Sequence, residues 1–191
     1  MIGLPIAWAY GHVIEWGIHK YVLHGAGKKR DNFWSFHFFD HHRSARTKNM
    51  DDAIYRGSPL QWNPAGKELL GLGLLGAAHL PLAPVAPWFV FGLGLSGLSY
   101  YRKHKRSHLD LEWCRRELPW HYDHHMGPNQ DANWGVRRDW VDRLMGTREP
   151  YMGSEKEARD YARRQARLAK EAAHRESLKN AQPERTSDKA A

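Results

Sequence analysis

Residues 69–101 contain no Asp, Glu, Lys or Arg, and this stretch limits the possible folds of the chain more than any other feature. Near its middle lie three prolines, Pro81, Pro84 and Pro87. Proline interrupts a helix because it lacks a backbone donor and clashes with the preceding turn. The stretch therefore predicts a helical hairpin. We expect it to lie in a membrane, as a re-entrant dip or as two thin spans, because so small a chain could hardly cover it from water.

A second apolar segment, residues 2–23, is interrupted only by His12, Glu15, His19 and Lys20. A spanning helix needs about 20 apolar residues. Lys and Arg gather after this segment and again after the hairpin, and such residues favour the cytoplasmic side of a membrane. The sequence thus predicts an all-α, integral-membrane helical bundle with a cytosolic histidine-rich cap. The histidines and the C terminus would be cytoplasmic, in a bacterial inner membrane or an ER-type membrane.

The net charge of +8 would ordinarily suggest nucleic acid or an anionic surface as the partner. The sequence contains no motif typical of nucleic-acid binding, so we attribute the charge to topology and to attraction toward lipid headgroups. We therefore expect lipid and membrane as partners, and no nucleic acid. The single cysteine, Cys114, excludes a disulfide scaffold and a zinc site with several cysteines.

The composition divides the chain into a membrane-embedded domain, residues 1–150, and a charged tail, residues 151–191. Ser154 and Glu157 have the spacing of a capping box, which predicts a helix that begins at residue 155. This helix, rich in Ala, Arg, Lys and Glu, should be solvated and should end near Leu178. Residues 180–191 are expected to be disordered.

Ten of the 13 histidines fall into four groups, here called boxes: His19 and His24; His37, His41 and His42; His104 and His108; and His121, His124 and His125. Residues three or four apart lie on one face of a helix, about 5–6 Å from each other. Adjacent residues point about 100° apart, so a His-His pair can give one ring to each of two metals. The pattern favours a dinuclear site in a helical bundle. If residues 69–101 turn back as a hairpin, all four boxes emerge on the same side.

Ten imidazoles exceed the four ligands of a structural zinc site. A nitrogen-rich shell with open positions favours iron that activates O2. Imidazole suits iron, copper, nickel and zinc alike, so the residues alone do not choose the metal, and two iron ions with O2 as co-substrate are the favoured expectation. Zinc binds such ligands more tightly than ferrous iron, so zinc can replace it in purified protein.

The order and spacing of the boxes resemble those of the fatty acid hydroxylase (sterol desaturase-like) superfamily, which are integral-membrane, non-haem di-iron enzymes. The stretch from Asn133 to Val136 and the stretch from Asp142 to Thr147 are also similar to that family, although Val141 stands where it usually has Trp. The resemblance covers about residues 16–147. It implies a helical bundle whose metal ligands are the ten box histidines.

The resemblance also implies an activity, the O2-dependent hydroxylation of a lipid C–H bond, with a fatty acyl or sphingolipid chain as the leading substrate. Carotenoid or sterol hydroxylation or desaturation is the alternative within the same superfamily. Because the sequence contains no cytochrome b5 domain, we expect electrons from a separate protein of ferredoxin or cytochrome b5 type. An alternative from another class is a histidine-rich membrane protein that handles zinc.

A histidine that binds a metal through one ring nitrogen commonly donates the N–H of its other ring nitrogen to an acceptor, which fixes the orientation of the ring. Glu15, one helical turn before His19, is a candidate for this role. Other candidates lie within or near the later boxes and motifs: Asp40, Asp110, Asp123 and Asn133.

Overall fold

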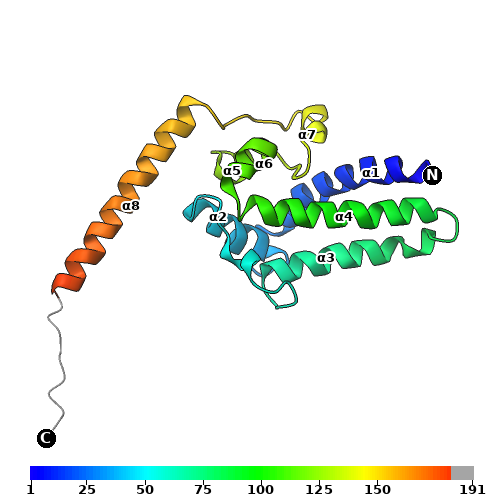
Figure 1. Ribbon diagram of the computed structural model, residues 1–191, viewed down its shortest axis with the longest axis horizontal. Coiled ribbons are helices and arrows are strands. Elements are labelled where there is room, and N and C mark those ends of the chain that lie inside the picture. The colour runs from blue at the N-terminus through cyan, green and yellow to red at the C-terminus, as the bar shows by residue number, and fades with distance from the viewer. Residues whose placement is uncertain (182–191) are drawn as a thin grey trace, which may run out of the picture. The chain divides into compact units, whose positions relative to one another are not determined.

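The computed structural model describes residues 1–181, with side chains through residue 178. Every regular element in these residues is a helix (Figure 1), so the all-α class is confirmed. The chain divides into two compact units, Met1–Met152 and a second one that begins at Gly153. The longer elements of the first unit are α1 (Gly3–Gly17), α3 (Pro64–His79) and α4 (Pro87–Ser107). Its shorter α-helices are α2 (Arg43–Thr47), α5 (Leu111–Glu117), α6 (Pro119–Met126) and α7 (Trp140–Leu144).

Four further helical segments are not α-helical. The π-helices are η1 (Ile18–Ala26), which continues α1, and η2 (His37–His42), which leads into α2. The 3₁₀ segments are η3 (Ala53–Arg56) and η4 (Leu80–Leu82).

The predicted hairpin is confirmed as α3 and α4, which lie side by side (Figure 1) and are joined by η4 and a proline-rich turn. Asn63 caps α3, because its side chain accepts a hydrogen bond of 2.9 Å from the backbone N–H of Gly66. Pro64 and Pro87 occupy the first turns of the two helices, where proline costs no hydrogen bond. The sequence therefore specifies both where the hairpin turns and where its second arm begins.

The predicted integral-membrane bundle is wrong, and so is the assignment of a cytoplasmic side in an inner or ER-type membrane. No helix among the described residues is both long enough and apolar enough to cross a membrane. The physical reason lies in the helix lengths. α3 has 16 residues, which correspond to about 24 Å of helix against about 30 Å of hydrocarbon, and the 15 residues of α1 are continued by a π-helix that carries His19, Lys20 and His24. α4 has 21 residues, but its last turns carry Arg102, Lys103, Lys105 and Arg106.

α1 packs closely against α4, the second arm of the hairpin. A Cβ atom at Gly92 of α4 would lie 2.9 Å from Cβ of Ala7 in α1. Gly11 of α1 similarly allows close approach to Ser96 of α4, whose hydroxyl a Cβ would overlap. These two glycines let the backbones approach closely enough to fix α1 beside the hairpin.

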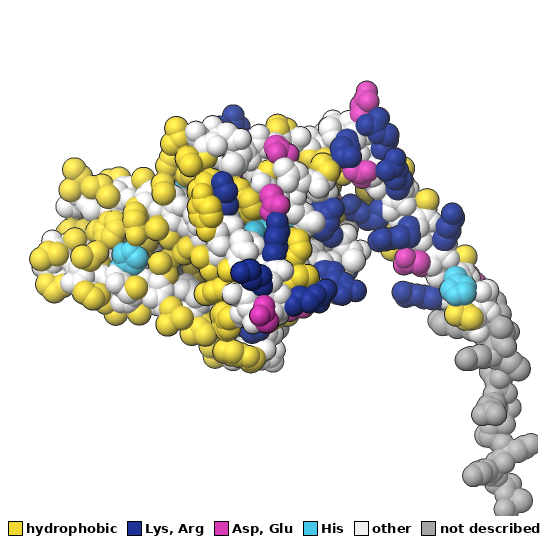
Figure 2. All heavy atoms as spheres, turned by 180° about the vertical axis from the view of Figure 1, so that it is seen from behind, with side chains coloured by type: hydrophobic (Ala, Val, Ile, Leu, Met, Phe, Trp, Pro, Cys, Tyr) yellow, Lys and Arg dark blue, Asp and Glu magenta, His cyan; other side chains and the backbone are white. Residues whose placement is uncertain are grey.

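Hydrophobic side chains gather at the end of the first unit that contains the turn between α3 and α4, where Figure 2 shows few charged groups. Those that are more than half exposed on α3, α4 and their connection are Leu74, Leu80, Val85 and Phe91. Buried apolar residues pack instead around α5 and α6, where they include Met50, Cys114, Leu118, Met126 and Tyr151. This hydrophobic core therefore packs around α6, which carries the fourth histidine box.

The second unit contains α8 (Glu155–Ala181). Its predicted capping box is confirmed, because Ser154 Oγ accepts from the N–H of Glu157 at 3.2 Å, and the Glu157 carboxylate accepts from the N–H of Gly153 at 2.7 Å. The helix continues past Leu178, so residues 180 and 181 are helical rather than disordered. The remainder of the predicted disordered segment, residues 182–191, lies outside the described residues.

Candidate metal centre

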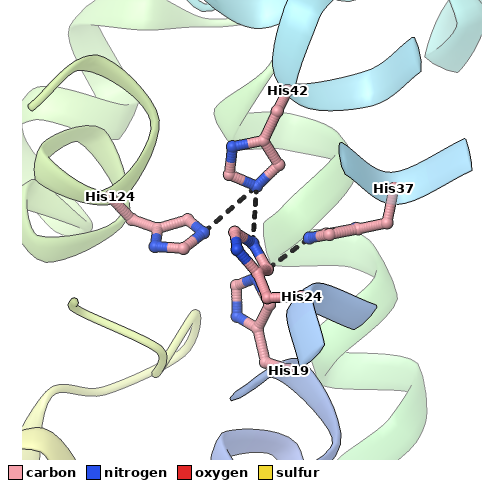
Figure 3. Close-up of side chains that lie close together, drawn as sticks. All are labelled: His19, His24, His37, His42 and His124. Atoms are coloured by element: carbon pink, nitrogen blue, oxygen red, sulfur yellow. Dashed lines mark hydrogen bonds between the residues drawn. The ribbon is translucent and has the colours of Figure 1, made fainter. Parts of the chain in front are cut away.

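Nine of the ten box histidines converge into two buried groups. Within each group, the candidate ligand nitrogens all lie within 4.8 Å of one another. The first group (Figure 3) consists of His19, His24, His37, His42 and His124. The second group consists of His41, His104, His108 and His125. The tenth histidine, His121, adjoins the second group, and its Nε2 lies 3.2 Å from Nε2 of His108.

The two π-helices supply the first and second boxes. His19 and His24 lie on η1, and the three histidines of the second box lie on η2. Hydrogen bonds in a π-helix join residues five apart, so positions i and i+5 lie about one turn apart. An α-helix turns once in 3.6 residues and would direct the rings of His19 and His24 away from each other. The π-helix thus explains the five-residue spacing of the first box.

The third and fourth boxes lie at the end of α4 and on α6. His104 is in the last turn of α4, and His108 is its C-cap. Adjacent histidines point in different directions, and each adjacent pair is divided between the two groups. His42 and His124 belong to the first group, whereas their neighbours His41 and His125 belong to the second. The two groups therefore lie next to each other, with 4.2 Å between the ring centroids of His42 and His125.

Hydrogen bonds at Nδ1 determine which nitrogen is free in three of the five rings of the first group. His19 donates from Nδ1 to the carbonyl oxygen of Trp134 at 2.6 Å, and His124 donates to that of Ala132 at 2.6 Å. His42 has its Nδ1 3.2 Å from the side-chain oxygen of Gln130. In a neutral ring with a protonated Nδ1, Nε2 carries a lone pair. All three Nε2 atoms are therefore acceptors.

Two of these acceptor atoms, on His42 and His124, lie against each other, and Nε2 of His24 lies beside them. Nε2 of His42 is 3.1 Å from Nε2 of His124 and 3.0 Å from Nε2 of His24 (Figure 3). Two lone pairs at this distance form no hydrogen bond, and a buried polar atom without a partner is costly. A cation between Nε2 of His42 and Nε2 of His124 would satisfy both. The donor set of the first group therefore fits a metal ion.

Burial keeps these histidines neutral. Desolvation lowers the pKa of His19 to about 3 and holds the pKa values of His37, His42 and His124 well below the usual range. Neighbouring imidazoles lower these pKa values further, because a second positive charge would repel the first. Neutral imidazole is the form that binds metal.

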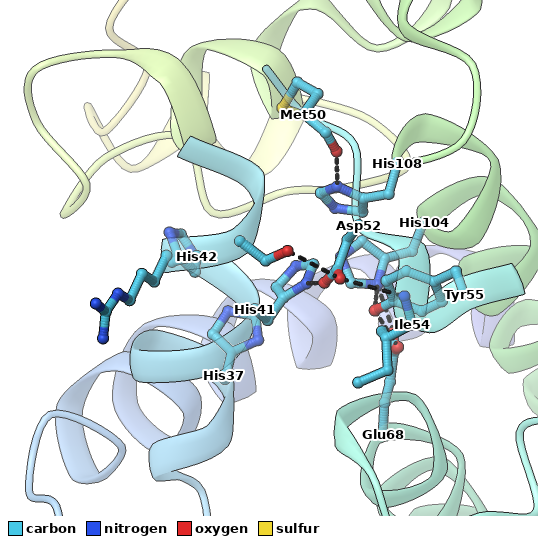
Figure 4. A network of polar contacts seen from close by, with 12 residues as sticks. His37, His41, His42, Met50, Asp52, Ile54, Tyr55, Glu68, His104 and His108 are labelled. Atoms are coloured by element: carbon cyan, nitrogen blue, oxygen red, sulfur yellow. Dashed lines mark hydrogen bonds and ion pairs between the residues drawn. The ribbon is translucent and has the colours of Figure 1, made fainter. Parts of the chain in front are cut away.

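The second group is backed by two carboxylates (Figure 4). His41 donates from Nδ1 to the carboxylate of Asp52 at 2.9 Å, and His104 donates to that of Glu68 at 2.5 Å. His108 donates to the carbonyl oxygen of Met50 at 2.8 Å. The Nε2 atoms of His41 and His104 have no hydrogen-bond partner in the described chain. The second group thus also presents unpaired nitrogens that fit a metal ion.

Glu68 lies on α3 and receives further hydrogen bonds from tyrosines. The hydroxyl of Tyr55 donates to Glu68 at 2.6 Å, and Tyr100 also bonds this carboxylate. Burial raises the pKa of Glu68 to about 7, because a desolvated carboxylate is disfavoured in its charged form. The orientation of His104 therefore depends on a carboxylate contributed by the opposite arm of the hairpin.

Acidic candidates predicted near the boxes lie elsewhere. Glu15 accepts from Arg137 and from the backbone N–H groups of Val136 and Arg137, rather than from His19. Asp40 is exposed, and Asp110 caps α5 through the N–H of Trp113.

The other two candidates brace the stretch that follows the fourth box. Asp123 is buried, pairs with Arg148 at 2.8 Å and accepts from the N–H of Met152. Asn133 bonds Arg148 and the backbone of Glu149. These residues fix the stretch whose carbonyl groups receive His19 and His124.

Sequence reasoning missed Asp52 and Glu68. Asp52 lies 11 residues after its partner His41, and Glu68 lies 36 residues before His104, so neither shares a box with its histidine. One signal was present. Glu68 is the last charged residue before the uncharged stretch, and a carboxylate at the start of an apolar helix is costly unless it has a partner.

A cavity of about 540 Å³ lies among α1, α3 and α4. This volume is within the range of small-molecule sites. Most of its lining is apolar and includes Ile14, Val22, Leu72, Leu75, Leu93 and Leu98. Histidines of both groups, His19, His37 and His41, also line it. Four lining glycines, Gly73, Gly76, Gly94 and Gly97, have open space where a Cβ atom would lie.

The arrangement thus combines two buried imidazole clusters with an apolar chamber that reaches both of them. Comparison with family models, with curated proteins and with solved structures gave no match in any of the three cases.

Proposed function

We propose that this chain is an O2-dependent, non-haem di-iron hydroxylase that acts on a C–H bond of a lipid, with a fatty acyl or sphingolipid chain as the leading substrate. One observation carries the proposal. His19, His37 and His41 belong to the two histidine groups and also line the apolar cavity. An apolar chain in that cavity would lie against the metal-binding groups, within walls that are mostly apolar.

The five histidines of the first group would hold one iron ion, and the four of the second would hold the other, with His121 beside it. Bound iron supplies the oxidising power toward an unactivated C–H bond that amino-acid side chains lack. Iron is preferred over zinc in the proposal because the proposed reaction reduces O2. Zinc would still compete for these nitrogens, since it binds imidazole more tightly than ferrous iron does.

The protein itself would position and enclose the reactants. Asp52, Glu68 and Met50 fix the rings of the second group, and the carbonyl groups of Trp134 and Ala132 fix rings of the first. Such partners hold each Nε2 toward a common point. The largely apolar walls of the cavity would exclude water from the substrate chain.

Hydroxylation of a C–H bond by O2 gives an alcohol and water, and it consumes two electrons and two protons. We propose that a separate protein of ferredoxin or cytochrome b5 type supplies the electrons.

The experiment compares lipids from cells that express wild-type protein or His124→Ala under ¹⁸O2. His124 is fully buried in the first group, so its loss should remove iron and abolish the new product. His174→Ala is the matched control, because His174 is exposed on α8 and belongs to neither group. We expect one ¹⁸O atom on a defined lipid with the wild type and with His174→Ala, and none with His124→Ala.

Metal analysis of the purified proteins completes the test. About two iron ions per wild-type chain are expected, with a clear loss in His124→Ala. Oxidised lipid at wild-type levels in His124→Ala would contradict the proposal. A wild type that holds zinc, and stays inert after reloading with iron and reductant, would favour the zinc-handling alternative.

A further inference from the structure

A polar cluster interrupts the apolar wall of the cavity. It consists of Glu15 on α1, Ser96 on α4 and Arg137 in the segment before α7, and all three residues line the cavity. Arg137 is 2% exposed. Burial of a charged side chain in an apolar wall is costly, so its hydrogen bonds require a full account.

Arg137 uses three of its five N–H groups within the protein. Nε donates to the Glu15 carboxylate at 2.5 Å. Nη1 donates to Ser96 twice, to Oγ at 2.6 Å and to the carbonyl oxygen at 3.1 Å. Nη2 makes no hydrogen bond within the described chain. The two N–H groups of Nη2 therefore lack an oxygen or nitrogen acceptor, although the guanidinium carbon also lies 5.2 Å from the centroid of the Trp8 ring.

The position of Nη2 follows from Gly11. A Cβ atom at Gly11 would lie 3.2 Å from Nη2, and Gly11 itself lines the cavity. Gly11 is eight residues before His19, which corresponds to about 12 Å along a helix. The free donors thus lie about two helical turns from the first histidine group.

The charge of Arg137 is already balanced, because Glu15 pairs with it at 2.5 Å. Another anion would bring an uncompensated charge into an apolar cavity, which is unfavourable. A neutral oxygen would use the free N–H groups at no such cost. The cluster therefore favours a neutral acceptor over a carboxylate.

We infer that Arg137 Nη2 forms a subsite for a hydroxyl or carbonyl oxygen of an otherwise apolar ligand, and that this contact sets how far the ligand extends toward the histidines. The inference rests on the proposed function only in taking this cavity as the substrate site. In the proposed reaction, the oxidised carbon and the polar group would be separated by several bonds. Arg137 would then be a specificity-determining residue.

The test measures binding to the full-length chain as purified, without O2 or reductant. Decan-1-ol, n-decane and decanoate compete with Nile red, a neutral fluorophore, in wild type, Arg137→Lys and Arg138→Lys. Lysine keeps the positive charge but has one nitrogen, so it cannot pair with Glu15 and also present Nη2. Arg138 is the exposed neighbour and serves as the matched control.

We expect Arg137→Lys to weaken decan-1-ol about tenfold and n-decane less than about twofold, while Arg138→Lys changes neither. The hydration free energy of a free ligand is the same in every assay, so it cancels when the affinity of one ligand is compared between two proteins. Equal changes for the two ligands, or no change, would overturn the inference. So would decanoate binding more tightly than decan-1-ol and losing that advantage in Arg137→Lys, because the acceptor would then be an anion.

If Arg137→Lys fails to fold, the double variant Glu15→Gln with Arg137→Met replaces it, because it removes both charges and leaves neither unpaired. The same selective loss for decan-1-ol is expected. The proposed hydroxylation is scored separately by ¹⁸O incorporation. Failure of the subsite in this binding assay is therefore distinguishable from failure of the oxidation.

Discussion

Two histidines of the second group donate hydrogen bonds to carboxylates, and this makes the two groups chemically different. His19 and His124 donate to neutral carbonyl oxygens, whereas His41 and His104 donate to Asp52 and Glu68. A carboxylate partner makes an imidazole more basic and fixes its orientation more strongly. We therefore expect the second group to bind its metal more tightly than its smaller number of histidines would suggest.

Asp52→Asn and Glu68→Gln should each weaken metal binding at the second group by about 10–100-fold, because each removes the charge behind one ligand. Chelator competition followed by metal analysis should show one of the two ions leaving earlier than in the wild type. Asp51→Asn is the control, since Asp51 precedes Asp52 but pairs with Arg56 at the surface. Equal weakening of both ions, or of neither, would contradict this assignment.

At the residue scale, the sequence predicted the histidines far better than their partners. A box is a local pattern, so His37, His41 and His42 are visible in six consecutive residues. The acids that orient the ligands come from distant segments, as Glu68 does for His104. Asp40 is close in sequence but exposed, which illustrates why proximity along the chain is a poor guide to such partners.

The π-helices are the elements on which the geometry of the first group most depends. η1 continues α1 without a break and changes the hydrogen-bonding pattern at Ile18, immediately before His19. The extra residue in each turn brings His24 onto the same face as His19. The helix therefore forms a metal-binding face that an uninterrupted α-helix would not provide.

Deletion of Tyr21, which is 63% exposed, should shorten the first box to a four-residue spacing and rotate His24 together with everything after it. We expect helical content by circular dichroism close to that of the wild type, but loss of the ion bound by the first group. Tyr21→Ala keeps the spacing and should retain both ions. Full metal content in the deletion variant would show that the π-helix is dispensable.

The boundaries of helices were predicted correctly where individual residues fix them. The prediction failed where it depended on the length of a helix. Pro81, Pro84 and Pro87 located the turn of the hairpin, and Ser154 with Glu157 located the start of α8. The count of apolar residues in 2–23 suggested one long helix, but the α-helix ends at Gly17. Hydropathy does not reveal such a change in hydrogen bonding.

Across the whole first unit, stability should depend on bound metal. Ten buried imidazoles, two of them with nitrogen lone pairs facing each other, carry a desolvation cost that the hydrogen bonds at six of the rings offset only in part. A ligand that binds only the folded state stabilises it according to its affinity and concentration.

Removal of metal by a chelator, followed by dialysis, should lower the Tm by at least about 10 °C, since 1 kcal/mol corresponds to roughly 2–4 °C in a chain of this size. Differential scanning calorimetry measures the change, and addition of ferrous iron or zinc should restore the original Tm. An unchanged Tm after complete metal removal would mean that the histidine groups are stable without a cation.

Four glycines of the cavity lining leave room for substitution. A Cβ atom added at Gly73, Gly76, Gly94 or Gly97 would meet no other atom within 4 Å. Glycine codons become alanine or valine codons by one nucleotide change. Descendants of this chain could therefore acquire new preferences for ligand size in single mutational steps, while the histidines stay as they are.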